Sequence, residues 1–499
     1  MSMLESRAGT DDATTEWVRD PLGSDLDDRV VVRLPVVRRP RWVDQSSWPL
    51  PRSDRRLPPG WPIAAAVAGW PLWWALGVTI LVFPLAAIPL AWSLHRRGRV
   101  KTPPGFLIWV LFLALVTLSV FALDVELVGT AMSSGIGRYF AFGFRLLNYL
   151  ALTVMLLYLG NTTEAELPRR RVISWFCVLA VSCIVLGSLS VVMPDFTFKA
   201  PASYLLPGAL QDEGGGMVQL AQVQPVLGET SPRPAAPFPF TNAWGNNLSL
   251  LLVWLVVGWG VLGSRSRRTV LLLVLTVALV PIIYSLNRGM WIGLGLAVAV
   301  AVVRLALWGR IKALLVVLAV LTVAGSVLAA SPLENLISAR AETGHSNEVR
   351  GSLLGTAIGA AASSPVVGFG STRKTLGSDE SIAIGPSEAC PKCGARNIGS
   401  TGQLTLLLVS QGFLGVVLYL GFLFWALFSF LRDRSPLGLA GTTVVGMEIF
   451  YCLVYSALTM PLAITFLSIG LLWRNARLRR GDDVVGDGVP PEVVEVGRR

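Results

Sequence analysis

Long apolar runs alternate with short basic segments along most of this chain. The runs cover residues 62–94, 104–123, 137–160, 172–193, 244–263, 270–286, 290–308, 313–328, 402–431, 437–458 and 461–473. Most of them approach or exceed the ~18 residues that a helix needs to cross the hydrocarbon core of a bilayer. The pattern therefore predicts an all-α polytopic membrane protein.

The first run is too long for one upright span, because a single helix over 62–94 would measure about 50 Å. Two short spans, broken near Gly69–Pro71 or at Pro84, fit the run better. We therefore expect a hairpin here, which brings the total to about twelve transmembrane helices.

Basic segments set the expected orientation. They lie at residues 95–101, 169–171, 265–268, 304–312, 432–434 and 474–480. Placing them all in the cytoplasm, as the positive-inside rule requires, puts both termini inside. Two long loops then lie outside, 194–243 and 331–401, the second between spans nine and ten. Arg288 falls at the outer tip of the hairpin formed by spans seven and eight.

The expected organisation has three parts. Residues 1–61 are polar and proline-rich, show no cleavable signal peptide, and read as a disordered cytoplasmic tail. Residues 62–476 form the membrane domain, and residues 477–499 a second cytoplasmic tail.

Composition agrees with a membrane protein. The chain is 53% hydrophobic and only 15% charged, against about 25% charged residues in a soluble domain. Its net charge of +11 resides mainly in the segments beside the apolar runs, so we expect a lipid bilayer as partner and no nucleic acid.

The hairpin tip reads Y-S-L-N-R-G-M-W-I-G-L over residues 284–294. An arginine at a membrane interface costs little, because it can extend to the head groups. Arg288 is therefore either a turn residue between two helices or part of a polar site, and position alone does not decide between them.

The loop 331–401 concentrates polar residues. From Ser346, a candidate N-cap, the apolar positions Val349, Leu353, Leu354 and Ala357 predict a helix. Arg350 lies within this helix and His345 just before it. His345 is a bystander or a participant in chemistry, and both remain open.

The same loop contains S-S-P-V-V-G-F-G-S-T-R-K over residues 363–374. The turn at Gly368–Gly370, followed by Arg373 and Lys374, is a weak candidate for an anion cradle. Further on, Cys390 and Cys393 have the spacing of half a zinc site, but no second pair exists and the other cysteines lie in expected spans. We expect a local disulfide outside the membrane rather than a metal site.

Other polar and aromatic residues mark the outer side. Amides of Asn242, Asn246 and Asn247 can cap the following span or bind sugar hydroxyls. Arg138, Arg145 and Asn148 share one helix face, and Arg145 lies about two turns inside, where it needs a partner or an aqueous cavity. Trp291 and Trp244 are candidates for stacking on sugars, although interfacial tryptophan belts are the commoner explanation.

Three segments together resemble the O-antigen ligase and polymerase superfamily. S-L-N-R-G-M-W-I-G-L is similar to its Ser-Arg-Gly hairpin, and N-E-V-R-G-S-L-L-G-T-A followed by S-P-V-V-G-F-G to its arginine-bearing loop helix. G-Q-L-T-L-L-L-V-S-Q-G-F-L-G-V-V-L-Y-L resembles the segment that re-enters the membrane, and P-F-T-N-A-W-G-N-N-L is a weaker fourth match. The resemblance extends from about Gly105 to Trp473.

The resemblance implies a glycosyltransferase of the bacterial cytoplasmic membrane. It would move or polymerise a polyprenyl-diphosphate-linked glycan, without metal or cofactor, onto a glycan or lipid acceptor at the outer face. Arg288 and Arg350 would stabilise the departing diphosphate, and Arg145, Asn242, Trp291 and Arg373 would contact substrate.

One departure weakens a strict ligase assignment, because the family's histidine falls at Thr401-Gly402 here. His345, Glu342 or Glu348 are candidate replacements. Ligase and polymerase both remain open, and the rival class is a transporter or flippase of a lipid-linked or other amphiphilic substrate.

Overall fold

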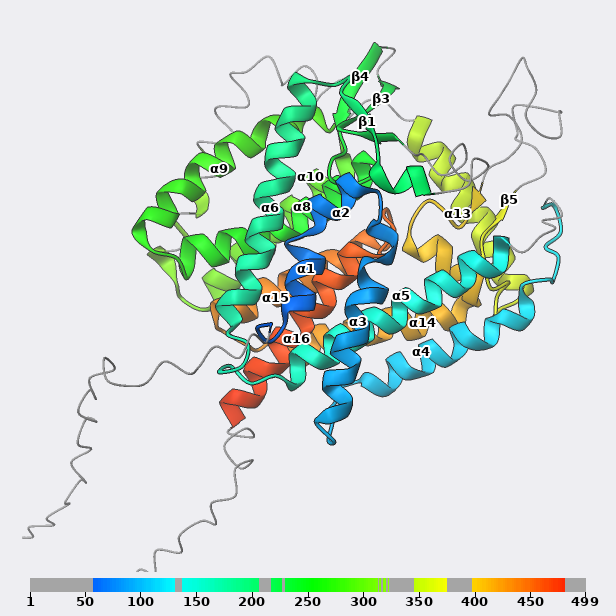
Figure 1. Cartoon of the computed structure of the whole chain (residues 1–499), viewed down its shortest axis with the longest axis horizontal. Coiled ribbons are helices and arrows are strands. Elements are labelled where there is room, and N and C mark those ends of the chain that lie inside the picture. Colours follow the sequence, from blue (N-terminus) through cyan, green and yellow to red (C-terminus); the bar gives the residue numbers. More distant parts are fainter. Residues whose placement is uncertain are drawn as a thin grey trace, which may run out of the picture. The chain divides into compact units, whose positions relative to one another are not determined.

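The computed structural model describes residues 57–130, 137–205, 217–226, 229–312, 345–374 and 397–480, with 314, 315, 317–319 and 322. Helices hold most of these residues (Figure 1). Seven of the described helices are long and apolar enough to cross a membrane: α3 (Thr79–Arg96), α5 (Gly137–Asn161), α6 (Arg169–Val192), α8 with η4 (Thr241–Val261), α9 (Arg265–Tyr284), α10 (Arg288–Leu307) and α14 (Gln403–Phe430). The expectation of a helical membrane protein is confirmed at this level.

The first apolar run forms a hairpin, but it bends at a different place from either expected break. Helices α1 (Trp61–Val67) and α2 (Trp70–Leu76) make one arm, and α3 makes the other. The turn lies at Gly77–Val78, where Gly77 has a φ of 80° that only glycine adopts easily. Gly69 joins α1 to α2, and Pro84 lies inside α3.

Three further helices are shorter or less apolar: α4 (Phe106–Leu118), α15 (Pro436–Tyr451) and α16 (Met460–Arg480). Helix α4 continues into the 3₁₀ turn η2 (Ser119–Ala122), and α8 into a π-helical turn η4 (Val256–Val261). The expected span 313–328 lies largely outside the described residues, as does the tail 1–56. The twelve-span count therefore stays a prediction.

The core packs aromatic rings where α4, α5, α14 and α16 meet. Trp109 is fully buried, lies 4.9 Å from both Phe112 and Phe466 between ring centroids, and donates its N–H to Thr153 at 2.8 Å. Large apolar side chains are exposed elsewhere, including Leu107 (69%), Phe140 (70%) and Phe428 (65%). Exposure of this kind over helix faces is typical of a lipid-facing surface.

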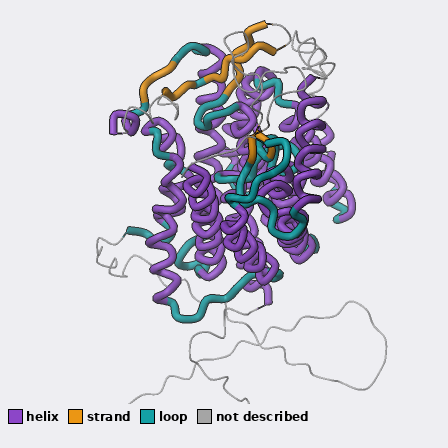
Figure 2. Tube along the Cα trace, turned by 90° about the vertical axis from the view of Figure 1, so that its right-hand side faces the viewer, coloured by secondary structure: helices purple, strands orange, loops and turns teal. Residues whose placement is uncertain are grey.

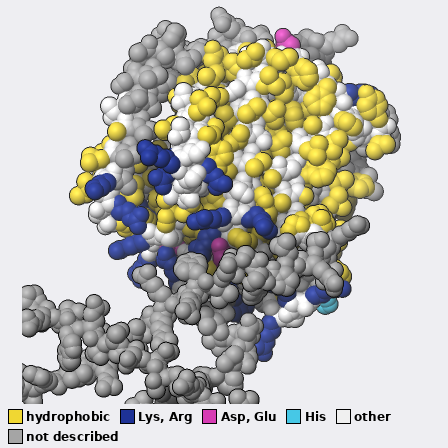
Figure 3. Space-filling view, turned by 60° about the vertical axis from the view of Figure 1, so that its left-hand side comes forward, with side chains coloured by type: hydrophobic (Ala, Val, Ile, Leu, Met, Phe, Trp, Pro, Cys, Tyr) yellow, Lys and Arg dark blue, Asp and Glu magenta, His cyan; other side chains and the backbone are white. Residues whose placement is uncertain are grey.

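Basic loops gather at one end of the helices. Arg97 pairs with Glu166, Arg474 with Glu164, and Arg479 with Asp433. These contacts join the segments 95–101, 161–171, 431–435 and 474–480. On the face in Figure 3, Lys and Arg side chains collect below a broad apolar surface. The segments that charge assigns to one membrane side therefore lie together, and assigning that side to the cytoplasm remains a prediction.

Glu166 shows how this end is neutralised. Partial burial alone would raise its pKa, but hydrogen bonds from the Thr163 amide and from Arg97 outweigh burial, so the pKa lies below its ordinary value. The carboxylate therefore stays charged and holds loop 161–168 against Arg97.

The opposite end carries short strands, which the all-α expectation did not include. β1 (Thr197–Lys199) pairs antiparallel with β2 (Met217–Gln219), and β3 (Ala221–Val226) with β4 (Glu229–Pro234). Figure 2 shows strands beyond the helix ends. A third pair, β5 (Arg373–Lys374) and β6 (Asn397–Ile398), brackets the undescribed residues 375–396. Of these strands, β4 carries Arg233, whose Nε–H donates to the Ser285 carbonyl.

Candidate functional site

The site begins at the turn between α9 and α10. Leu286 adopts a left-handed backbone with a φ of 49°, and Asn287 then caps α10, accepting from the Met290 N–H at 3.3 Å. Asn287 also donates to the Thr241 carbonyl at 3.4 Å, which ties the turn to the start of α8. Arg288 is the first residue of α10 and is half-buried.

Tyr455 joins this turn to the connection between α15 and α16. Its buried hydroxyl donates to Asn287 Oδ1, and a Cβ on Gly289 would lie 2.6 Å from that hydroxyl oxygen. Only glycine therefore fits after Arg288. Arg288 is thus flanked on both sides by residues in contact with Tyr455.

Two further arginines reach the same place from other elements. Arg233, on β4, is buried and donates its Nε–H to the Ser285 carbonyl at 2.7 Å. The positive charges of Arg350, on α13 (His345–Ser363), and of Arg233 both act on the Tyr455 hydroxyl. The turn that carries Arg288 therefore lies amid a cluster of three arginines drawn from α10, α13 and β4.

A cavity of about 650 Å³ adjoins this cluster. Tyr455 lines it together with Asn242, Asn247 and Thr401. Asn247 donates to the Ala243 carbonyl at 2.8 Å, but its buried Oδ1 accepts no hydrogen bond within the described part of the chain. A buried amide oxygen without a donor is costly unless a ligand or water supplies one. An unsatisfied amide oxygen therefore lies in the wall of a polar cavity that Tyr455 joins to the arginine cluster.

Known proteins do not assign this site. No family model, curated protein or solved structure matches the chain. The resemblance to O-antigen ligases and polymerases therefore stays a prediction.

A break in α14 positions the helix that carries Arg350. Gly412 interrupts α14 with a φ of 64°, which frees the carbonyls of Val409 and Ser410 from helical bonding. The Phe369 and Gly370 amides donate to these carbonyls, both at 2.9 Å, and the Leu414 amide donates to the Pro365 carbonyl at 3.2 Å. This exchange fixes the end of α13 to α14. The expected loop helix is confirmed, and Leu353 and Ala357 of its apolar stripe are buried.

The same contacts exclude the proposed anion cradle. The amides of Phe369 and Gly370 are used by α14, and the Gly368 amide donates to Ser364 at 3.2 Å. Arg373 is 3% exposed and donates to the carbonyls of Leu123, Phe369 and Val125 at 2.9, 3.0 and 3.1 Å. Its guanidinium thus fastens the loop to the end of α4, and these contacts disfavour the expected substrate contact of Arg373.

The remaining residues that the sequence singled out lie at different places in the fold. Arg145 donates to the Gly370 carbonyl at 3.5 Å, so its partner is the loop backbone. Trp291 donates to the Ile282 carbonyl at 3.1 Å and links α10 to α9. Trp244 is fully buried against Gly187, which leaves no face for a sugar. Asn242 is exposed and lines the cavity.

Several expectations fall outside the described residues. Cys390 and Cys393 lie there, as does Glu342. His345 begins α13, but its side chain is not described, and the same holds for Glu348. The candidate disulfide and the replacement for the family histidine therefore remain predictions.

Sequence reasoning missed three residues of this region. Arg233 sits in a Pro-rich stretch, where no periodicity marks it, and Tyr455 resembles any interfacial tyrosine. Glu448 is fully buried in α15, and neither of its carboxylate oxygens has a hydrogen-bond partner in the described part of the chain. An acidic residue inside an apolar run was an available signal for Glu448.

Proposed function

We propose that this protein transfers or polymerises a polyprenyl-diphosphate-linked glycan at the outer face of the cytoplasmic membrane. The observation that carries the proposal is the cluster of Arg233, Arg288 and Arg350 beside a polar cavity. The cluster lies at the end of the helices opposite the basic loops. It is therefore outside if those loops are cytoplasmic.

Arginines suit a diphosphate because the planar guanidinium donates two parallel hydrogen bonds to phosphate oxygens. When the anomeric carbon is attacked, negative charge develops on the leaving diphosphate. Fixed cations at that position lower the barrier, since they need no reorganisation during the reaction. Arg288 and Arg350 would act on the leaving group directly, and Arg233 would add charge while holding the turn at Ser285.

The cavity would hold the sugars of donor or acceptor. Asn242, Asn247 and Thr401 supply polar groups to its wall. Thr401 occupies the position at which the resembled family carries its histidine. The described lining contains no histidine and no carboxylate. His345, at the start of the helix that carries Arg350, is our candidate for accepting the hydroxyl proton.

The test is arginine substitution with charge-matched controls. Arg288→Ala and Arg350→Ala should each abolish assembly of surface polysaccharide and cause the lipid-linked donor to accumulate. Arg310→Ala removes an exposed charge at the basic end and should have no effect. All variants must reach the membrane at wild-type levels. Normal polysaccharide in either site variant would overturn the assignment.

A reconstituted assay separates transfer from transport. Purified protein in detergent, supplied with donor and acceptor, has no second compartment. Formation of a new glycosidic bond under these conditions supports a transferase. Movement of a lipid-linked glycan across proteoliposomes without any bond formed would identify a flippase instead.

A further inference from the structure

Glu448 is a buried carboxyl group that lies outside the arginine cluster. It occupies the last turn of α15 and is fully buried. Neither of its carboxylate oxygens has a hydrogen-bond partner in the described part of the chain. An uncompensated carboxylate inside a protein is so costly that it is neutralised by a bound proton or cation. In a membrane protein, an acidic residue of this kind marks a functional site.

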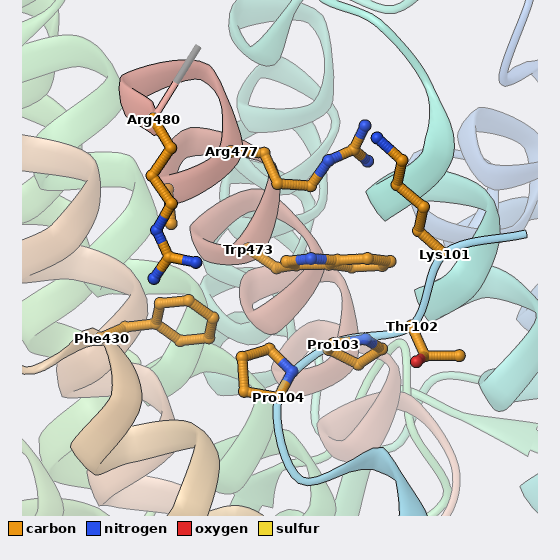
Figure 4. A pocket seen from close by; sticks show the side chains of 9 residues that line it. Lys101, Thr102, Pro103, Pro104, Phe430, Trp473, Arg477 and Arg480 are labelled. Atoms are coloured by element: carbon orange, nitrogen blue, oxygen red, sulfur yellow. The ribbon is translucent and has the colours of Figure 1, made fainter. Parts of the chain in front are cut away.

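The helices packed against α15 supply no described cation to Glu448. Burial is the only described influence on its charge. Helix α8 and η4 have no titratable side chain, and α14 has only Tyr419. The arginines of α10, Arg288 and Arg304, lie at its two ends. Those of α16 lie in its last two turns, where Arg477 lines the pocket at the basic end in Figure 4.

Buried tyrosine hydroxyls lie between Glu448 and the cavity beside the arginine cluster. The charge of Glu448 acts on the Tyr419 hydroxyl, which has no hydrogen-bond partner among the described residues. Tyr149, on α5, also acts on Tyr419, and both rings pack against Phe112 with centroids 5.3 Å away. The Tyr149 hydroxyl in turn accepts a hydrogen bond from Gln403 Nε2 at 2.9 Å. Polar groups therefore extend from the carboxyl group to the start of α14.

Gln403 connects this series to the wall of the cavity. Its backbone amide donates to the Tyr455 carbonyl at 2.7 Å, and its side-chain oxygen accepts from the Ala457 amide at 3.2 Å. Tyr455 and Ser456 line the cavity, as does Thr401, two residues before Gln403. The series thus begins at the cavity wall and ends at a carboxyl group without a partner.

We propose that Glu448 is a proton-binding site, and that Tyr149 and Tyr419 carry the proton between it and the cavity. A hydroxyl can donate and accept a hydrogen bond at once, so it can pass a proton on without keeping a charge. Water molecules would supply the hydrogen bonds that the buried oxygens do not make to one another. The proposal does not depend on glycosyl transfer, because a transporter could use the same group.

Infrared spectroscopy of the full chain in lipid bilayers detects the bound proton, because a protonated carboxyl absorbs apart from a carboxylate. At neutral pH the wild type should show a carboxylic acid band that Glu448→Gln loses completely. The control Glu166→Gln should keep the band, because Glu166 is ionised and pairs with Arg97. Loss of the band in both variants, or its absence from the wild type, would overturn the proposal.

Transfer into heavy water tests the route, since the band shifts when deuterium replaces the proton. Tyr419→Phe should slow this exchange by roughly five- to tenfold, the factor that one lost hydrogen bond represents. Tyr451 is the matched control, because it is also buried beside Glu448 but donates to Ser249. Tyr451→Phe should exchange at the wild-type rate, and equal slowing in the two variants would refute the route.

Two further measurements use the wild-type protein alone, so they decide the proposal even if Glu448→Gln does not fold. The apolar reagent dicyclohexylcarbodiimide reacts with protonated carboxyls inside membranes and should label Glu448; no labelling would contradict a bound proton. Replacing sodium by a large organic cation should leave the infrared band unchanged. A band that appears only without sodium would show that sodium occupies the site, and the proton assignment would be wrong.

Discussion

Removing the Tyr455 hydroxyl, which contacts the turn that carries Arg288, tests the geometry of the arginine cluster most directly. In Tyr455→Phe, Asn287 Oδ1 loses the Tyr455 donor and keeps only the Met290 amide at 3.3 Å. A buried hydrogen bond of this kind is worth about 1 kcal/mol. The cap of α10 should weaken by that amount, and Arg288, the next residue, should lose its fixed position.

The chain supplies a matched control one turn earlier. Tyr451 is also buried, and its hydroxyl donates to Ser249 Oγ at 2.7 Å instead of to the turn that carries Arg288. Tyr451→Phe should therefore cost about the same 1 kcal/mol in the free energy of unfolding. The two variants differ in what the lost bond positions.

The assay compares stability with function in both variants. Misplacing a catalytic group by about 1 Å can slow a reaction by roughly a hundredfold. Tyr455→Phe should thus lose at least about tenfold in glycan transfer and in affinity for a polyprenyl diphosphate, while Tyr451→Phe keeps both within about twofold of the wild type, on the same principle. If Tyr455→Phe binds and transfers normally, or if both variants lose activity equally, the hydroxyl does not position Arg288 and the reasoning is refuted.

Three further predictions concern the expected outer loop 331–401 and the break in α14 that contacts it. Arg373→Met should lower the free energy of unfolding by about 3 kcal/mol, because three backbone carbonyls lose a charged donor. The control Lys374→Met, at an exposed residue, should change it by less than about 0.5 kcal/mol. Denaturation in mixed micelles measures both variants. Gly412→Ala should cost at least about 2 kcal/mol, since its Cβ would lie 2.5 Å from the Ser364 carbonyl oxygen, and wild-type stability would contradict the break in α14. Cys390 and Cys393 should be oxidised in native membranes, which complete thiol labelling without reductant would disprove.

The helices were predictable because the bilayer imposes one strong rule on sequence. Every backbone polar group in hydrocarbon must be satisfied within its own segment, so a long apolar run has few alternatives to a helix. The runs 137–160 and 402–431 accordingly match α5 and α14 to within a residue or two. The bend of the first hairpin was not predictable in the same way. Gly69, Gly77 and Pro84 can each interrupt a helix, and the sequence does not show which of them forms the bend; the structure bends at Gly77, where φ is 80°.

The structure of the polar loops could not be predicted from local sequence, because it depends on partners that are far away along the chain. The turn at Gly368–Gly370, followed by Arg373 and Lys374, predicts an anion cradle when only neighbours in sequence are considered. The partners of its amides, Val409 and Ser410, are about forty residues away and become available only because Gly412 breaks α14. The same dependence hid Arg233, whose partner Ser285 lies in another loop.

Several arginines have a clear structural role, because they donate to backbone carbonyls at the C-terminal end of a helix. Arg304 donates to the carbonyls of Leu431 and Asp433, at the C-terminal end of α14. Arg373 does the same beyond α4, and Arg477 at the end of α5. Free carbonyls and the negative end of the helix dipole favour a cation there, so folding alone explains these side chains.

Arg288 occupies the opposite kind of position, the first residue of a helix, where the dipole is positive and disfavours a cation by about 0.3–1 kcal/mol. Arg233 lies close enough to add further positive charge to the same Tyr455 neighbourhood. Arg233 also has a structural role, because it donates to the Ser285 carbonyl at the C-terminal end of α9. An anion bound at the start of α10 would interact favourably with the helix dipole and with the charge of both arginines. A polyprenyl diphosphate should therefore stabilise the wild-type protein more than Arg288→Ala, and equal stabilisation of the two proteins would refute this role for Arg288.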